Sequence, residues 1–369
     1  MKKWYSIYLF VVVAALSVAL IGCEEEEEPN KEEPDEPMEM DFTAHLTNQI
    51  NNIILPTMEE YQSEMDDFVA AVNGISASAD AVNLAALRTA YQNAYLAYQA
   101  VAVHNYYATA NLNLINTTNL YPVDVDLLEN LIETASYNFS TTAQERANGY
   151  PAIDYMLYGP EDVLAYFNDN PRRFDFLKAL VEDMKSKSDA LVDRWSGSLK
   201  TNFVENGGTQ LGSSVSVQLN ESMVYYEDHI RENKVGIPIG LLGPNDSPIP
   251  PDATKIEAYY QSLAEGNENF TFALLRAAVE EMEDMYLGET ADQTDGIGYD
   301  DLLLAIEQSA IDNDIKSQYQ TIYNLIESRT SIAGDATLYE NIQNIVTLYK
   351  SDLFPVLNVQ DADGANDGD

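Results

Sequence analysis

Cysteine and histidine are scarce in this chain. One of the 369 residues is a cysteine, Cys23, and three are histidines. A single thiol rules out an internal disulfide, and once it is modified no cysteine remains for a nucleophile or a zinc site. None of the histidines, His45, His104 and His229, lies in the His-Glu-x-x-His pairing that surrounds zinc in many peptidases. The fold must therefore be stabilised by core burial.

Basic residues are also few. The chain carries 19 Lys and Arg against 61 Asp and Glu, which gives a formal net charge of −42. So negative a chain repels a phosphate backbone, and nucleic acid is excluded as a partner. The sequence has no Gly-x-Ser-x-Gly elbow, no Walker loop and no Gly-x-Gly-x-x-Gly turn. Serine hydrolysis and nucleotide binding therefore have no basis in it.

The first residues have the three parts of a bacterial export signal. Lys2 and Lys3 precede an apolar run over residues 7–21, and Leu20-Ile21-Gly22-Cys23 forms the cleavage site. The run is too short to span a bilayer comfortably. Because the last four residues match the bacterial lipobox, we expect residues 1–22 to be removed and Cys23 to anchor the protein to a membrane through lipid. An ordinary signal peptide with an incidental cysteine is the alternative.

Residues 23–41 are expected to form a disordered tether. The stretch is rich in Glu and Pro and has almost nothing to bury, so it cannot repay the entropy of ordering. Its acidic start, directly after the lipidated cysteine, resembles the surface-export signal of Bacteroidetes lipoproteins. We therefore expect a bacterial outer-membrane lipoprotein that is either exposed on the cell surface or faces the periplasm on a plain linker. Loss of Lys2 and Lys3 would take the formal charge to −44.

Apolar residues recur at helical spacing in the first half of the body. Three stripes cover residues 54–72, 84–101 and 174–195, the last of which ends at Ser196-Gly197. These stripes predict an N-terminal helical bundle over residues 42–205. The glycine-rich stretch that follows, up to residue 216, is expected to be a flexible connection.

Helical spacing resumes at Leu219, Met223, Tyr226 and Ile230 and continues to the end of the body. Only the proline- and glycine-rich residues 236–251 interrupt it, as a long loop that can hold neither a helix nor a central strand. No segment alternates as a strand. The sequence thus predicts an all-α fold of two packed helical-bundle halves. Its C-terminal bundle covers residues 206–358, and residues 359–369 form a flexible tail.

Residues 149–159 are the most informative segment. Gly149 permits a tight entry into a helix, and Pro151 suits the first helical position. Asp154, near the start of that helix, would complement the helix dipole. His104 and His229 are expected as surface or helix-capping residues. The abundant tyrosines, 24 in all, are expected to pack half-buried in the helical stripes.

The same segment resembles the signature of the imelysin family, a Gly-x-His-x-x-Glu stretch followed by aliphatic and aromatic residues and a glycine. Gly149 and Gly159 match the two glycines. The family histidine falls on Pro151, whose side chain has no donor atom. The family glutamate falls on Asp154, whose carboxylate is on a shorter side chain. Residues 229–240 and 256–260 are similar to the corresponding second-half region of imelysin-like lipoproteins. His229, Arg231 and Lys234 in that region are secondary site candidates.

The resemblance implies a mostly helical protein of the bacterial envelope, linked to iron uptake and carrying a disputed peptidase label. Its candidate cofactor is iron or another divalent metal, its candidate ligand residue is Asp154, and its candidate partners are iron- or haem-uptake proteins. The incomplete motif favours a non-catalytic protein that binds a ligand or partner at the cleft between the halves. Two alternatives stay open: a metallopeptidase of the imelysin type, and a structural or interaction subunit that docks through residues 236–251.

Overall fold

The computed structural model describes residues 40–241, 250–289, 296–333 and 336–362. Within these ranges every regular element is helical and there is no β-strand, which confirms the predicted all-α class. Asp41–Asp369 forms one compact unit. The predicted leader, Cys23 and nearly all of the tether lie outside the described residues, as do residues 242–249 of the predicted loop and 363–369 of the predicted tail.

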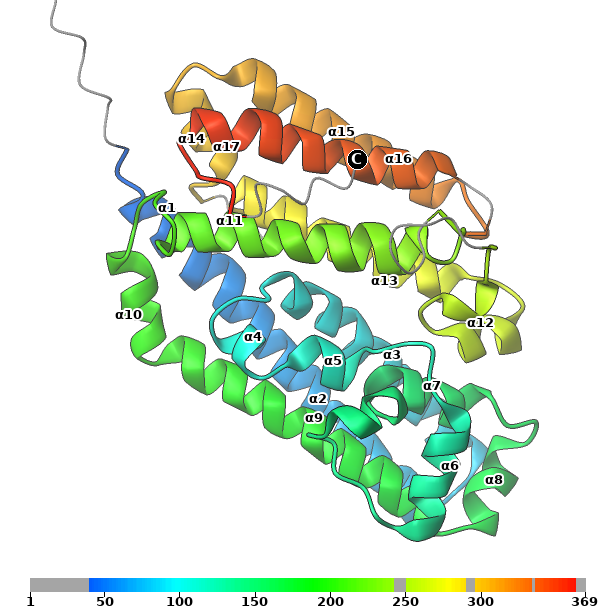
Figure 1. The fold of residues 1–369 in the computed structure, drawn as a ribbon. Helices are drawn as coiled ribbons and strands as arrows, with labels where there is room; N and C mark the ends of the chain where they lie inside the picture. Colours follow the sequence, from blue (N-terminus) through cyan, green and yellow to red (C-terminus); the bar gives the residue numbers. More distant parts are fainter. Residues whose placement is uncertain (1–39, 242–249, 290–295, 334–335, 363–369) are drawn as a thin grey trace, which may run out of the picture. The chain divides into compact units, whose positions relative to one another are not determined.

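The N-terminal part of the body is built on the long helices α2, α3 and α9. α2 packs along both of the others (Figure 1). Its apolar stripe, which includes Met58 and Met65, is buried. Asp80 begins α3 by accepting hydrogen bonds from the amides of Val82 and Asn83. The elements of this part are α1 (Thr43–Asn48), the π-helical turn η1 (Gln49–Ile54), α2 (Leu55–Ala77), α3 (Ala81–Val103), α9 (Arg172–Ser196) and α10 (Ser198–Glu205).

Short helices fill the chain between α3 and α9. One of them, α7, contains most of the segment that the sequence singled out, and it packs against α12 from the second half of the chain. The short elements are α4 (Ala108–Asn111), α5 (Leu114–Thr118), α6 (Val125–Thr134), the 3-10 helix η2 (Thr142–Ala147), α7 (Gly149–Tyr158) and α8 (Val163–Asp169).

The C-terminal part adds a second group of helices. α13 packs along α3 and also contacts α15, so it joins this group to the N-terminal helices (Figure 1). α16 packs against both α15 and η3. The elements are α11 (Ser214–Tyr225), the π-helix η3 (Tyr226–Gly236), η5 (Ala253–Lys255), α12 (Tyr259–Glu265), α13 (Asn269–Leu287), α14 (Tyr299–Ala305), α15 (Ser309–Glu327), α16 (Ala336–Thr347), η6 (Leu348–Leu353) and α17 (Phe354–Val356). The division into two halves at residue 206 stays a prediction.

The connection between α10 and α11 is more ordered than its composition suggests. The side-chain amide of Asn206 donates to the carbonyl of Gly212 at 2.9 Å, and the backbone N–H of Ser214 donates to the carbonyl of Asn206 at 2.9 Å. These bonds give partners to backbone groups that the glycine-rich turn would otherwise leave free. Hydrogen bonds thus hold this turn, and the flexibility of the connection stays a prediction.

The start of the predicted tail is also held in place. The Asn220 side chain donates to the carbonyl of Gln360 at 3.1 Å and accepts from the backbone N–H of Ala362 at 2.8 Å. Val359 is buried. Residues 359–362 thus lie against α11, which differs from the expectation of a flexible tail that begins at residue 359.

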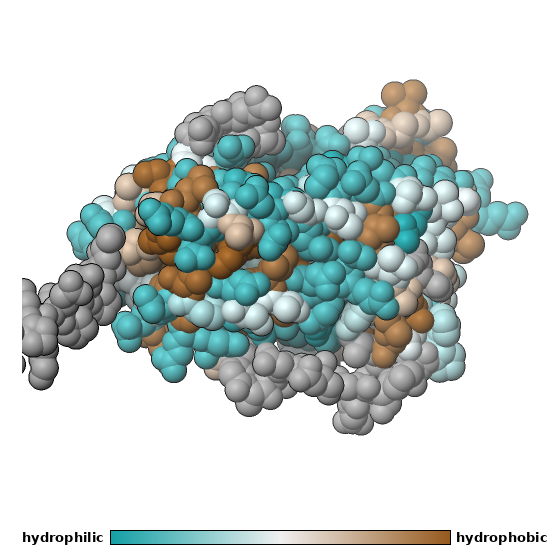
Figure 2. Space-filling view, turned by 90° about the horizontal axis from the view of Figure 1, so that it is seen from above, coloured by the Kyte–Doolittle hydropathy of each residue, from teal (hydrophilic) through white to brown (hydrophobic). Residues whose placement is uncertain are grey.

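The surface is mixed in polarity. Figure 2 shows hydrophilic residues over most of one face, with hydrophobic residues in separate patches. Across the part of the chain that the structure describes, no helix combines the length and the apolar character needed to cross a membrane.

Candidate functional site

Gly149 sets the entry into α7. Its φ is +67°, and a Cβ added there would lie 1.9 Å from the carbonyl oxygen of Thr118. A side chain is thus excluded both by the left-handed backbone and by the approach of α5. The glycine makes the tight entry that its place in the sequence suggested.

Pro151 is the third residue of α7. The sequence had suggested the first helical position, so that prediction is wrong by two residues. The missing N–H of Pro151 has no consequence there, because the first four amides of a helix have no partner within the helix. Pro151 is buried and lines a cavity. Gly159 ends the helix so close to Tyr155 that a Cβ would lie 2.6 Å from its ring. Gly159 therefore serves close packing.

Asp154 lies on the same helix and is only 2% exposed. Its Oδ2 accepts a hydrogen bond from the backbone N–H of Tyr260 at 2.7 Å, and its Oδ1 accepts from that of Gln261 at 3.0 Å. The expectation that Asp154 complements the dipole of its own helix is wrong, because the carboxyl group holds the first turn of α12 instead. Burial raises the pKa of Asp154 to about 7, an effect that the two amides oppose and nearby Glu265 increases.

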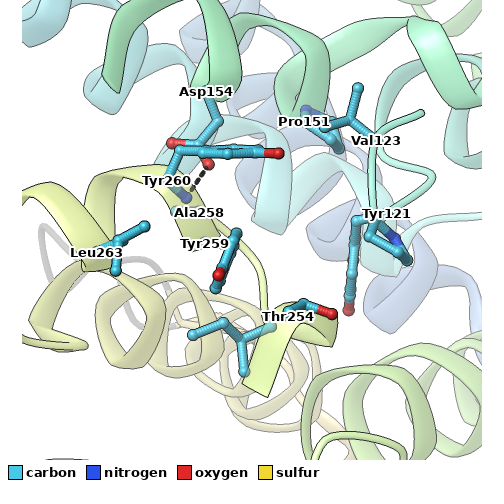
Figure 3. A pocket seen from close by; sticks show the side chains of 11 residues that line it. Tyr121, Val123, Pro151, Asp154, Thr254, Ala258, Tyr259, Tyr260 and Leu263 are labelled. Atoms are coloured by element: carbon cyan, nitrogen blue, oxygen red, sulfur yellow. Dashed lines mark hydrogen bonds between the residues drawn. The ribbon is translucent and has the colours of Figure 1, made fainter. Parts of the chain in front are cut away.

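A cavity of about 450 Å³ lies between α7, the loop before α6 and the start of α12 (Figure 3). Its walls are mainly aromatic and aliphatic. Tyr259 and Tyr260 contact each other with ring centroids 5.1 Å apart and planes at 69°, and Figure 3 shows Tyr121 across the cavity from them. The lining residues are Tyr121, Pro122, Val123, Pro151, Asp154, Thr254, Ile256, Ala258, Tyr259, Tyr260 and Leu263.

A buried ion pair stands behind this cavity. Lys234, 3% exposed, pairs with Glu257, 2% exposed, which lies between the lining residues Ile256 and Ala258. Lys234 also donates to the side-chain oxygen of Gln99 at 2.7 Å, and Asn119 donates to Glu257 at 2.6 Å. Burial lowers the pKa of Lys234, and the carboxylate of Glu257 opposes that effect. These bonds fix the segment that leads into α12.

The other two secondary candidates have different partners. His229 is not among the residues that line the cavity; its ring packs on Tyr225 at 5.1 Å and its Nδ1 accepts from the side-chain amide of Asn233. Burial lowers its pKa to about 4. Arg231 pairs with Glu232 at 2.8 Å. Of the three candidates on η3, only Lys234 reaches the polar network behind the cavity.

Glu257 and the tyrosines of the cavity wall were not predicted from the sequence as site residues, and one histidine was predicted in the wrong place. His104 is fully buried rather than at the surface, with its Nε2 2.5 Å from a carboxylate oxygen of Glu281. One signal was available for Lys234. It follows Tyr226 and Ile230 at four-residue spacing on a stripe that is otherwise apolar, and a charged residue in such a place usually has a buried partner.

The residues present do not fit a metal held by the family motif. Pro151 offers no donor at the position where the resemblance to the family motif places histidine, and both oxygens of Asp154 accept hydrogen bonds from backbone amides. Within the described ranges, no group of three or more His, Cys, Asp or Glu side chains is arranged to hold a metal ion. The motif segment therefore builds a helix clamp and a cavity wall.

Two solved structures share this fold. One is an imelysin-like protein from Psychrobacter arcticum 273-4, with 15% sequence identity, a TM-score of 0.67, and coverage of 86% of this chain and 96% of that one. The other, from Parabacteroides distasonis ATCC 8503, is named as an iron-regulated protein A precursor; the identity is 15%, the TM-score 0.68, and the coverage 85% and 94%. At this identity the likeness shows the fold alone.

Comparisons of the sequence point the same way. Among curated proteins, none matches the chain. The family model described as Imelysin matches residues 54–351, which is most of the chain and nearly all of the described body. The match includes α7, α12 and the π-helix that carries Lys234. This chain therefore belongs to the imelysin family.

Proposed function

We propose that this protein is a non-catalytic member of its family that binds an organic ligand in the cavity between α7 and α12. The observation that carries the proposal is the pair of hydrogen bonds that the carboxyl group of Asp154 accepts. Its two carboxylate oxygens hold the amides of Tyr260 and Gln261, and Pro151 stands beside it in place of a metal-binding side chain. The motif thus positions aromatic side chains around a cavity of the size that small ligands occupy.

A metallopeptidase is less well supported. Zinc peptidases hold the metal with three protein ligands and need a general base beside the bound water. The cavity lining offers one carboxyl group, Asp154, and neither histidine nor a second acidic side chain among the residues described. Ligand binding needs only what the lining has, which is a concave surface of mainly aromatic and aliphatic residues with a few polar groups.

The test is a screen for ligands that raise the unfolding temperature of the full-length protein in nonionic detergent. The compounds are ferric citrate, haemin, choline, maltotriose and a dipeptide. At least one is expected to raise the midpoint by roughly 2 °C or more at saturation. The shift should disappear in Tyr259→Ala and remain in Tyr137→Ala, a partly exposed tyrosine that packs elsewhere, on Phe139 and Phe176. No shift with any compound would count against the proposal.

We also propose that the protein acts as a lipid-anchored envelope protein. The support is in the sequence: two lysines, a short apolar run and the lipobox that ends at Cys23. The acidic residues after Cys23 would then hold the folded body away from the outer membrane, on either of its faces. Mass spectrometry of the N-terminal peptide should find acyl chains on Cys23, and Cys23→Ser should leave the membrane fraction. An unmodified Cys23 in the wild type would show the anchor to be wrong.

Iron or haem acquisition is the setting that we propose for this binding role. The support is the name of the Parabacteroides distasonis neighbour, which describes an iron-regulated protein, together with the shared family. A protein in that setting should become more abundant when iron is withheld, and deletion of its gene should slow growth on haem as the iron source. Unchanged abundance and growth would remove this setting and leave the binding proposal intact.

A further inference from the structure

We propose that the cavity between α7 and α12 recognises the positively charged head of an organic ammonium ligand, by the faces of Tyr121, Tyr259 and Tyr260 and the carboxyl group of Asp154. The inference rests on the proposed function and names the class of ligand. It would make this site an aromatic cage, the arrangement with which proteins bind quaternary and methylated amines.

The tyrosines are arranged as the walls of such a cage. Tyr259 and Tyr260 meet edge to face with their planes at 69°, so they form two adjoining walls, and Tyr155 contacts Tyr260 with ring centroids 5.1 Å apart and planes at 71°. Figure 3 shows Tyr121 on the opposite side and Pro151 above the same space. A cation within about 6 Å of an aromatic ring's centroid is attracted by the negative face of the ring.

The charge of the site favours a cation. Among the described residues that line the cavity there is no Lys, Arg or His, and the one ionisable carboxyl group is Asp154. Lys255, which lies between the lining residues Thr254 and Ile256, pairs with Asp252 at 4.0 Å. The whole chain carries a formal charge of −42, which concentrates cations near its surface and keeps anions away.

The hydrogen bonds of Asp154 favour a cationic ligand without N–H groups rather than a sugar ligand. Both oxygens already accept from backbone amides, and Thr254 is the one other lining residue with a polar side chain besides the tyrosines. A sugar needs several directional partners, whereas a quaternary ammonium group needs only nearby negative charge and aromatic faces. The cavity volume of about 450 Å³ holds such a head group together with an attached chain.

The test compares choline and tetramethylammonium with 3,3-dimethyl-1-butanol, the uncharged carbon analogue of choline. Binding to the full-length protein is measured by calorimetry at about pH 8, above the pKa of about 7 for Asp154. Both ammonium compounds should bind at least about tenfold more tightly than the analogue. Equal affinities, or no binding of either ammonium compound, would overturn the inference.

Variants separate the cation–π attraction from simple packing. Tyr259→Phe keeps an aromatic face and should retain most of the choline affinity, whereas Tyr259→Leu should lose about tenfold. Tyr137→Leu is the control and should bind as the wild type does. A Tyr259→Leu variant that folds and still binds choline normally would contradict the cage.

Failure of this inference can be told apart from failure of the proposed function. If a neutral compound of the screen stabilises the wild type but not Tyr259→Ala, and the ammonium compounds do not bind, then the cavity is a binding site for another class of ligand. If no compound binds in either experiment, both proposals are wrong.

Discussion

Asp154 and Tyr260 are 106 positions apart in the chain, yet the carboxyl group of Asp154 accepts a hydrogen bond from the backbone N–H of Tyr260 at 2.7 Å. This bond ties α7 to the first turn of α12. Asp154, which stands where the resemblance to the family motif places glutamate, thus holds α12 at the cavity wall. The carboxyl group of Asp154 is ionisable and buried, so its contribution to stability can be measured as a function of pH.

The first prediction concerns pH. Burial raises the pKa of Asp154 to about 7 from a usual 3.8, so the folded state binds a proton more tightly than the unfolded state between these values. The contribution of Asp154 to the free energy of unfolding should therefore be largest below about pH 4 and fall as pH rises toward 7, by up to roughly 1.4 kcal/mol per pH unit. Denaturant unfolding at several pH values measures it.

Asp154→Asn is the reference for this titration, because asparagine has nearly the same shape and does not ionise. The difference in stability between the wild type and Asp154→Asn should move in favour of the variant as pH rises from about 4 to 7. Asp169→Asn, at an exposed position, is the control variant. A difference that does not change with pH would mean that Asp154 titrates normally.

The second prediction concerns Gly149. Gly149→Ala would place a Cβ 1.9 Å from the carbonyl oxygen of Thr118 and would hold alanine at a φ of +67°. The strain of the left-handed backbone costs about 1–2 kcal/mol, and the clash adds to it. Gly266→Ala is the matched control, because Gly266 has a φ of +70° and nothing within 4 Å of an added Cβ. Denaturant unfolding should show that Gly149→Ala is less stable than Gly266→Ala. Equal losses of stability in the two variants would contradict the close approach of Thr118 to Gly149.

The third prediction concerns the ion pair behind the cavity. Lys234→Met leaves the Glu257 carboxylate buried without its cation, which should lower the free energy of unfolding by about 3–5 kcal/mol. Lys234→Met with Glu257→Gln should recover a large part of that loss, since a neutral amide costs less to bury. Lys178→Met removes an exposed pair with Glu182 and should cost less than about 1 kcal/mol. Additive losses in the double variant would show that the two residues are not coupled.

The fourth prediction restores the family motif. Pro151→His with Asp154→Glu places imidazole and a longer carboxylate on the wall of the cavity, where both residues now stand. The double variant should bind Zn²⁺ or Fe²⁺ more tightly than the wild type in equilibrium dialysis, because it supplies two of the ligands that such ions prefer. Asp154→Glu alone is the control. Wild-type protein that binds one ion per chain as tightly as the double variant would show that the present residues suffice for a metal.

The helices were predictable from the sequence because their signals are local. Met58 and Met65 recur at helical spacing and are buried in α2, and Gly149 marks the sharp entry into α7. Both signals need only residues within a few positions of each other. The sequence is less informative between α10 and α11, where glycines suggest flexibility. The hydrogen bonds of Asn206 order that turn, and a composition does not reveal them.

The site needed the tertiary structure. The sequence named Asp154 and Lys234, but it gave Asp154 the wrong partner and gave Lys234 none. The partner of Asp154 is a pair of backbone amides on α12, and the partner of Lys234 is Glu257, 23 positions further along. His104 was placed at the surface because its partner, Glu281, lies 177 positions away on α13.

The sequence by itself determined that this chain is helical, strongly acidic and almost free of cysteine, and that it carries Pro151 and Asp154 where its resemblance to the family motif places histidine and glutamate. Periodicity and residue identity are enough for these conclusions, since they depend on one helical turn or on a single side chain. Only the tertiary structure decided what the altered motif does. Whether a carboxyl group binds a metal, a helix or a ligand depends on which distant groups reach it and on how much water is excluded.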